Sequence, residues 1–156
     1  MRRSLYSLTL ATAGLVLASY TLIAANGQSD THQELAGARR ATARYHNLSQ
    51  ALADGYVNIN VFVPGQGFHY LKPELLDANF DPESPELLVY AADKNGRLRL
   101  VAVEYAVPLS ENRPEGFTGD QDLWGTNVDF DLWTLHAWLW LNNPNGIFAE
   151  FNPRVD

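Results

Sequence analysis

Hydrophobic and polar positions change their period once along this chain, from the period of a helix to that of strands. Between Thr31 and Ala53, apolar residues recur at intervals of three and four, which predicts an amphipathic helix. Asp30 and Gln33 have the spacing of a capping box at its start, and Gly55 follows its end. The pattern therefore predicts one long N-terminal helix.

After the helix, apolar and polar residues alternate as they do in half-buried strands. In residues 133–141, the aromatic and threonine content favours a strand over a buried helix. Residues 109–131 form a long acidic stretch that predicts a loop. One helix followed by about five strands predicts an α+β fold, with the N-terminal helix packed on a curved, mainly antiparallel sheet. The predicted strands are residues 57–63, 68–70, 86–92, 97–107 and 133–141.

The first 25 residues predict a signal peptide. Arg2 and Arg3 precede an uncharged stretch from Leu5 to Ala25, which ends in small residues. The stretch is also long enough to span a bilayer, so an uncleaved N-terminal anchor is the alternative. The predicted organisation is a signal peptide or anchor at residues 1–25, followed by one globular domain at 26–156. We therefore expect export to the periplasm or the cell exterior, or anchoring in the membrane by that segment.

Composition restricts the chemistry and the partners. The chain has no cysteine, which excludes disulfides, thiolate nucleophiles and cysteine-bound metals. Its net charge of −7 argues against nucleic acid and anionic membrane surfaces as partners. A small molecule or a metal ion is the expected partner, with membrane contact only through an uncleaved N-terminal segment. The sequence leaves the oligomeric state open.

Glu104 is the first candidate for chemistry. Simple alternation places it on one strand face with Leu98, Leu100, Ala102 and Ala106, all of them apolar. A carboxylate on such a face is costly unless it is paired, protonated or bound to a metal. The structural interpretation is a position on an edge strand or an ion pair with a nearby arginine, and the functional interpretation is a site.

Two histidines extend this candidate. His136 lies among three tryptophans, and His69 follows two glycines. Taken singly, each fits a structural role, as a core histidine bonded to the backbone or a turn histidine at the surface. Together with Glu104, they form a set of two histidines and one carboxylate, which suits iron, zinc or manganese. A metal site requires the three side chains to converge within about 5 Å of one another.

Several sequence blocks, spread over residues 42–155, together resemble a group of small exported bacterial proteins, most of them hypothetical and without an assigned function. The resemblance includes His69, Glu104 and His136 but implies no role for them. The blocks are ADGY at 53–56, GFHY at 67–70, PELLVY at 85–90, LRLVAVEY at 98–105, LHAWLW at 135–140 and FNPRV at 151–155.

Three functions remain open from the sequence. The leading hypothesis is an exported domain that binds a small ligand or a metal ion at His69, Glu104 and His136. The second is a metal-dependent enzyme, a hydrolase or an oxygenase, that uses the same three residues. The third is a structural or interaction protein without a chemical site, in which the histidines belong to an aromatic core.

Overall fold

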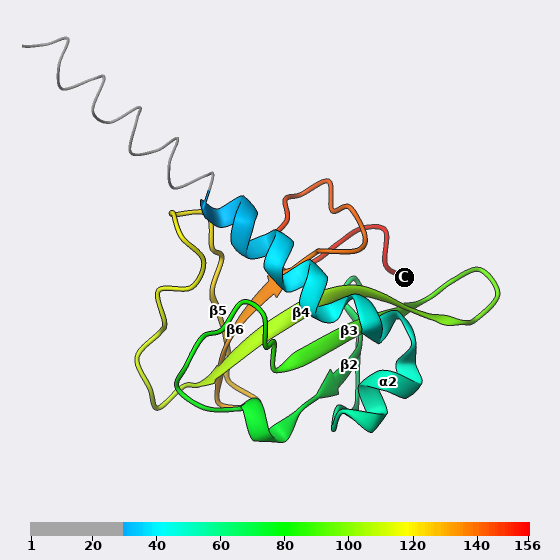
Figure 1. The fold of residues 1–156 in the computed structure, drawn as a ribbon, viewed down its shortest axis with the longest axis horizontal. Coiled ribbons are helices and arrows are strands. Elements are labelled where there is room, and N and C mark those ends of the chain that lie inside the picture. The colour runs from blue at the N-terminus through cyan, green and yellow to red at the C-terminus, as the bar shows by residue number, and fades with distance from the viewer. Residues whose placement is uncertain (1–29) are drawn as a thin grey trace, which may run out of the picture.

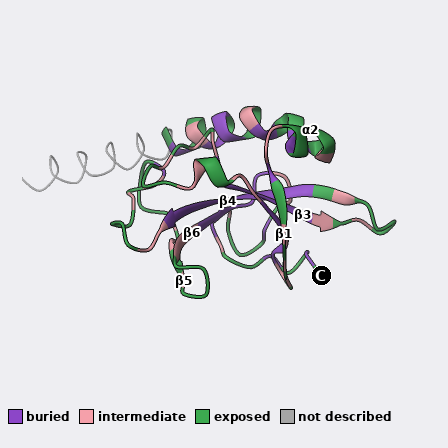
Figure 2. Ribbon diagram, turned by 90° about the horizontal axis from the view of Figure 1, so that it is seen from below, coloured by how far each residue is buried: buried purple, intermediate pink, exposed green. Residues whose placement is uncertain are grey.

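The computed structural model describes residues 30–156, which form a helical layer on one face of a curled sheet (Figures 1 and 2). This confirms the predicted α+β fold, although the sheet has six strands rather than about five. The predicted signal peptide at residues 1–25 lies outside the described residues, so export stays a prediction. Within residues 30–156, no helix is long and apolar enough to cross a membrane.

The predicted helix over residues 31–53 is broken into three pieces. An α-helix over residues 30–42 continues as a 3-10 helix, Ala43–His46, and a separate helix α2, Leu48–Ala53, follows. Asn47 stands between the last two with an extended backbone (φ −89°, ψ 103°), and its side chain accepts a hydrogen bond from the Ser49 N–H. The single-helix prediction is therefore wrong at Asn47, because a residue that caps the next helix interrupts the first.

Replacing Asn47 with alanine will lower the free energy of unfolding by about 1 kcal/mol, because the variant loses the acceptor that caps α2. Urea denaturation of the two proteins measures the difference. Ser49→Ala is the matched control, since it keeps the backbone donor of the cap, and we expect its change to stay within about 0.5 kcal/mol. Equal losses in the two variants would show that Asn47 does not cap the helix.

All neighbouring strands are antiparallel, and their order across the sheet is β1-β2-β3-β4-β6-β5. A short 3-10 helix, Pro73–Leu75, follows the second strand. The strands are β1 Val57–Val63, β2 Gly67–Leu71, β3 Leu87–Ala92, β4 Leu98–Pro108, β5 Gly125–Asn127 and β6 Leu132–Ala137.

The structure differs from the sequence prediction at the edge of the sheet formed by β5 and β6. Strand β5 lies within the predicted loop 109–131 and has only three residues, Gly-Thr-Asn, without apolar alternation. Strand β6 ends at Ala137, earlier than predicted, and the chain then turns away. The backbone N–H groups of Trp140 and Leu141 both donate to the carbonyl of Val101. Because both groups share one carbonyl of β4, the regular ladder between β4 and β6 does not continue past Ala137.

The main core lies between the helices and the sheet. Leu35 and Ala38 of the first helix pack against sheet residues such as Tyr90 and Tyr105. Each of the two tyrosine hydroxyls donates to a carbonyl, of Tyr45 and of Pro82, at 2.7 and 2.8 Å. These bonds are needed because an unpartnered buried hydroxyl is destabilising.

Phe117 also belongs to the main core, and Trp124 packs against it. The two residues thereby attach the long acidic segment to the domain, because large aromatic side chains bury much apolar surface. Only the part of that segment nearest β6 approaches the other face of the sheet, where the candidate site lies.

A β-bulge in β4 decides which residues share a face with Glu104. Ala102 is paired with Val89 and Leu100 with Tyr90, so Val101 is an extra residue in the ladder. Leu100 consequently joins the helix-facing core, whereas Ala102 and Glu104 lie on the opposite face. Simple alternation, which puts Leu98 and Leu100 beside Glu104, is wrong because the bulge exchanges the two faces.

Candidate functional site

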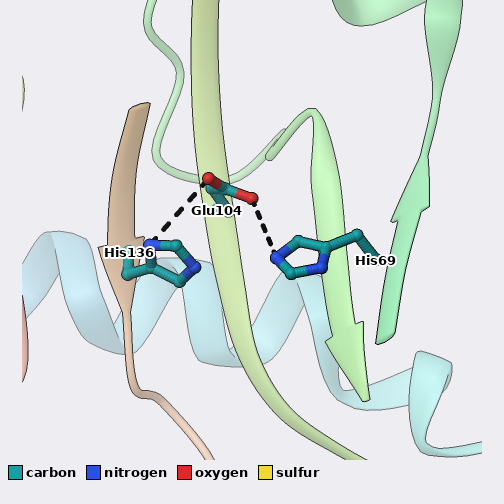
Figure 3. A group of neighbouring side chains, drawn as sticks. All are labelled: His69, Glu104 and His136. Atoms are coloured by element: carbon teal, nitrogen blue, oxygen red, sulfur yellow. Dashed lines mark ion pairs between the residues drawn. The ribbon is translucent and has the colours of Figure 1, made fainter. Parts of the chain in front are cut away.

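His69, Glu104 and His136 converge on the face of the sheet that points away from the helices (Figure 3). They come from β2, β4 and β6, three strands that are far apart in the sequence. Glu104 lies directly opposite His136 in the β4–β6 ladder. His69 reaches toward Glu104 across β3, which separates their two strands. The sequence singled out these three residues, and antiparallel pairing brings them together.

The three side chains form a compact buried group. Nε2 of His69 lies 3.4 Å from Oε2 of Glu104, and Nδ1 of His136 lies 3.9 Å from Oε1 of Glu104. One donor atom from each residue lies within 4.8 Å of the other two. All three residues are at most 6% exposed. The group therefore meets the distance required of a metal site, although its role as a set of ligands stays a prediction.

The hydrogen bond of His69 determines which of its two ring nitrogens is protonated and which presents a lone pair to Glu104. Nδ1 of His69 lies 3.4 Å from the carbonyl oxygen of Val61 in the neighbouring strand β1. A carbonyl only accepts, so Nδ1 carries the proton and Nε2 presents its lone pair toward Glu104. A histidine that binds a metal through one nitrogen usually donates from the other in this way.

His136 has a different environment. Its ring stacks on Trp138, with the ring centroids 6.1 Å apart and an angle of 16° between the planes. Nε2 of His136 is buried and has no hydrogen-bond partner. A buried polar atom without a partner costs about 1–3 kcal/mol, and such exceptions in native proteins call for an explanation. Nδ1 is the nitrogen that faces Glu104, so an ion bound there would still leave Nε2 without a partner.

Burial makes the group neutral when no metal is bound. It raises the pKa of Glu104 to about 8, with smaller contributions from the charges of Glu150 and Glu86. It lowers the pKa of His136 to about 3, and it also lowers the pKa of His69. At neutral pH, Glu104 is then mainly a carboxylic acid between two neutral imidazoles. Perturbed groups of this kind are concentrated at functional sites.

An arginine partner for Glu104, one structural interpretation open from the sequence, is not observed among residues 30–156. Arg97 and Arg99 both approach Asp93 at the β3–β4 hairpin, at 3.4 and 3.1 Å. The basic side chains that lie within 4.0 Å of the Glu104 carboxyl oxygens are instead the two imidazoles, at 3.4 and 3.9 Å. The carboxyl group therefore remains buried without a permanent positive charge beside it.

A cavity of about 210 Å³ opens beside the three residues. His69 and Glu104 line it, whereas His136 does not, so the group meets the cavity on one side. Strand β1 borders it on one edge of the sheet, and the β5–β6 connection borders it on the other. Figure 2 shows both edges curling to the same side of the sheet, opposite the helices. The curl of the sheet thus creates the cavity.

The sequence indicated part of this lining and missed the rest. Ile59, Val61 and Val63 form one predicted strand face, and their half-buried side chains line the cavity. Asn127 and Phe130 were missed because they lie in the segment predicted to be a loop. The available signal was the presence of apolar residues in a stretch that is otherwise polar and acidic.

Glu86 is a second buried carboxyl but belongs to the framework. Burial raises its pKa to about 8. One of its oxygens accepts a hydrogen bond from the Ala106 N–H at 3.0 Å. Glu86 precedes the first residue of β3, Leu87. Its side chain therefore satisfies a backbone N–H of β4 beyond the end of β3. It is a useful reference for Glu104, whose oxygens face two imidazoles instead.

The remaining histidines contribute nothing to this group. His32 and His46 are exposed on the helical layer. The ring of His46 contacts Trp140, with the centroids 4.4 Å apart. No other group of three histidine, aspartate or glutamate side chains within residues 30–156 brings its donor atoms together in this way.

Comparison of the chain with protein-family models, with curated proteins and with solved structures found no match.

Proposed function

We propose that this protein binds one divalent transition-metal ion through His69, Glu104 and His136. The observation that carries the proposal is the convergence of three buried donor groups that do not satisfy one another. Their separations of 3.4 and 3.9 Å are longer than a good hydrogen bond. The group is therefore poorly explained as an internal hydrogen-bond network.

The same separations suit a shared ion. Two donor atoms that each lie about 2.1 Å from one tetrahedral zinc ion stand about 3.4 Å apart. The distance between Nε2 of His69 and Oε2 of Glu104 is 3.4 Å. Nδ1 of His136 lies 3.9 Å from the other carboxyl oxygen, Oε1, and one donor atom from each of the three residues lies within 4.8 Å of the other two.

The donor set limits the choice of ion. Two imidazoles and one carboxylate suit zinc, iron or manganese. Calcium prefers six to eight oxygen ligands, and magnesium keeps an octahedral shell of oxygens, so neither fits. The second proposed function is a metal-dependent enzyme, a hydrolase or an oxygenase. It is supported by the cavity, because a three-residue set leaves coordination positions for water or a substrate on the side of His69 and Glu104.

Metal titration of the full chain tests the proposal. We expect the metal-stripped protein to take up one Zn²⁺, Mn²⁺ or Fe²⁺ per chain, measured by calorimetry and by metal analysis after gel filtration. His136→Ala will weaken the affinity about a hundredfold or more, because zinc sites with four ligands yield about 10–16 kcal/mol, or roughly 3 kcal/mol per ligand.

His46→Ala is the matched control, since it removes an exposed histidine on the other face of the sheet. It should bind the ion as the parent does. Circular dichroism of each variant establishes that it is folded. If His136→Ala and the parent retain the same amount of metal, the ion is held elsewhere and the proposal fails. If the parent takes up none of the three ions, a structural role for the group becomes the better account.

A further inference from the structure

The cavity beside the site offers a mainly hydrocarbon environment. More than half of its lining side chains are apolar, among them Ile59, Val61, Leu71, Phe130 and Leu132. The three β1 residues that line it are half-buried, whereas most residues of the central strand β4 are buried. Apolar side chains around an open volume gain by contact with an apolar body of matching size.

The charge at the base of the cavity has a definite sign when a metal is bound. A divalent ion with one carboxylate and two neutral imidazoles keeps one net positive charge. An uncompensated charge in apolar surroundings is unfavourable, so an anionic donor at the open position stabilises the site. Asp129 lines the cavity and the charge of Glu150 acts on Glu104, but both residues are exposed and lie outside the group of converging donors. Among the described residues, neither therefore supplies an anionic ligand at this position, which is left to an external anion.

The volume sets the size of that anion. A dry engineered cavity of about 150 Å³ accepts benzene. The cavity here is about 210 Å³, which accommodates a six-membered ring and one small substituent. A carboxyl substituent is ionised at neutral pH, whereas a phenol with a pKa near 10 is not. A six-membered apolar ring with one carboxyl group therefore has both the negative charge that the ion needs and the size that the cavity accepts.

We infer that the metal-bound protein takes a small hydrophobic monocarboxylate of about the size of benzoate. Its carboxylate coordinates the ion on the side of His69 and Glu104, and its hydrocarbon body lies among the apolar residues of β1 and of the β5–β6 connection. The inference rests on the proposed metal site and adds the chemical class of its ligand. No covalent step is involved, since the carboxylate only replaces bound water.

Binding of three probes to the Co²⁺-loaded full chain tests the inference. The visible spectrum of Co²⁺ reports a change in coordination, and calorimetry gives the affinity. We expect benzoate to bind at least tenfold more tightly than acetate, which has the donor without the ring. Benzoate should exceed benzamide, which has the ring without the charge, by at least the same factor. The metal-free chain should bind benzoate at least tenfold more weakly.

Ile59→Trp places a larger side chain in the cavity from β1, at a residue that is not one of the three donors. It should weaken benzoate binding at least tenfold and leave the Co²⁺ affinity unchanged. Phe62→Trp is the matched control, because Phe62 is an exposed aromatic residue of the same strand outside the cavity lining. It should leave both affinities unchanged.

The two proposals fail in different ways. If Co²⁺ binds but acetate binds as tightly as benzoate, the metal site stands and the ligand class is wrong. The same conclusion follows if the metal-free chain binds benzoate equally well. If Co²⁺ does not bind at all, the proposed metal site falls, and this inference falls with it.

Discussion

Zn²⁺ at a thousandfold excess over its dissociation constant will raise the free energy of unfolding by about 4 kcal/mol, because the ion binds only the folded chain. Glu104→Gln will remove most of this increase. The amide keeps the size of the side chain but supplies no anionic oxygen to the ion. Chemical denaturation with and without Zn²⁺, at one fixed pH, measures both effects.

Glu86→Gln is the matched control for this experiment. Like Glu104, Glu86 is a buried carboxyl with a pKa raised to about 8 by burial, but its oxygen bonds to the Ala106 N–H instead of facing the imidazoles. It should keep the full stabilisation by Zn²⁺, whatever its own stability. Equal loss of the metal effect in the two variants would show that the ion does not depend on Glu104.

The metal-free protein will lose stability as the pH rises from 6.5 to 8. Burial raises the pKa of both Glu104 and Glu86 from 4.5 to about 8 in the folded chain. Over this range the folded state holds a proton on each carboxyl that the unfolded state has released. Stability therefore falls by up to about 1.4 kcal/mol per pH unit for each carboxyl.

The histidines determine the lower limit of that window. Burial lowers the pKa of His136 to about 3, and it lowers that of His69 from the ordinary value of 6.5. Below pH 6.5 the unfolded chain binds the extra protons, so the histidines make stability fall as the pH falls. This opposes the carboxyls between pH 4.5 and 6.5. Above pH 6.5 the unfolded histidines lose their protons, so their opposing effect fades and the decline caused by the carboxyls becomes visible.

Urea denaturation of the metal-stripped protein in steps from pH 6.5 to 8 measures the decline. Glu104→Gln and Glu86→Gln should each remove about half of the slope, since each leaves one buried carboxyl. The charged or titratable groups that act on Glu104 are His69, His136, Glu86 and Glu150. A slope in Glu104→Gln equal to that of the parent would mean that Glu104 is ionised throughout the range.

These two predictions describe one property of the molecule. Three ionisable groups are buried at the expense of stability, and the ion that we propose would give them a common partner. Nε2 of His136 has no hydrogen-bond partner among the described residues. Local destabilisation of this kind is typical of functional sites, because residues chosen for binding are not those that pack best.

The fold class followed from the sequence because local periodicity determines it. The alternation of Val57, Ile59, Val61 and Val63 identified β1, and the last three of these residues line the cavity. Alternation failed where a single residue changed the register. The bulge at Val101 moves Leu100 to the helix-facing core, and no local pattern marks it. Asn47 interrupts the first helix for a similar reason, since its capping bond depends on backbone geometry.

By itself, the sequence determined which residues have unusual chemistry for their position. Glu104 stood out as a carboxyl in an apolar strand, and His69 and His136 stood out beside glycines and tryptophans. Only the tertiary structure decided that the three meet within 4.8 Å. Their distance depends on the order of the strands and on the curl of the sheet, which are set by contacts between distant segments. Periodicity carries information on which face a side chain occupies, but not on which strands become neighbours.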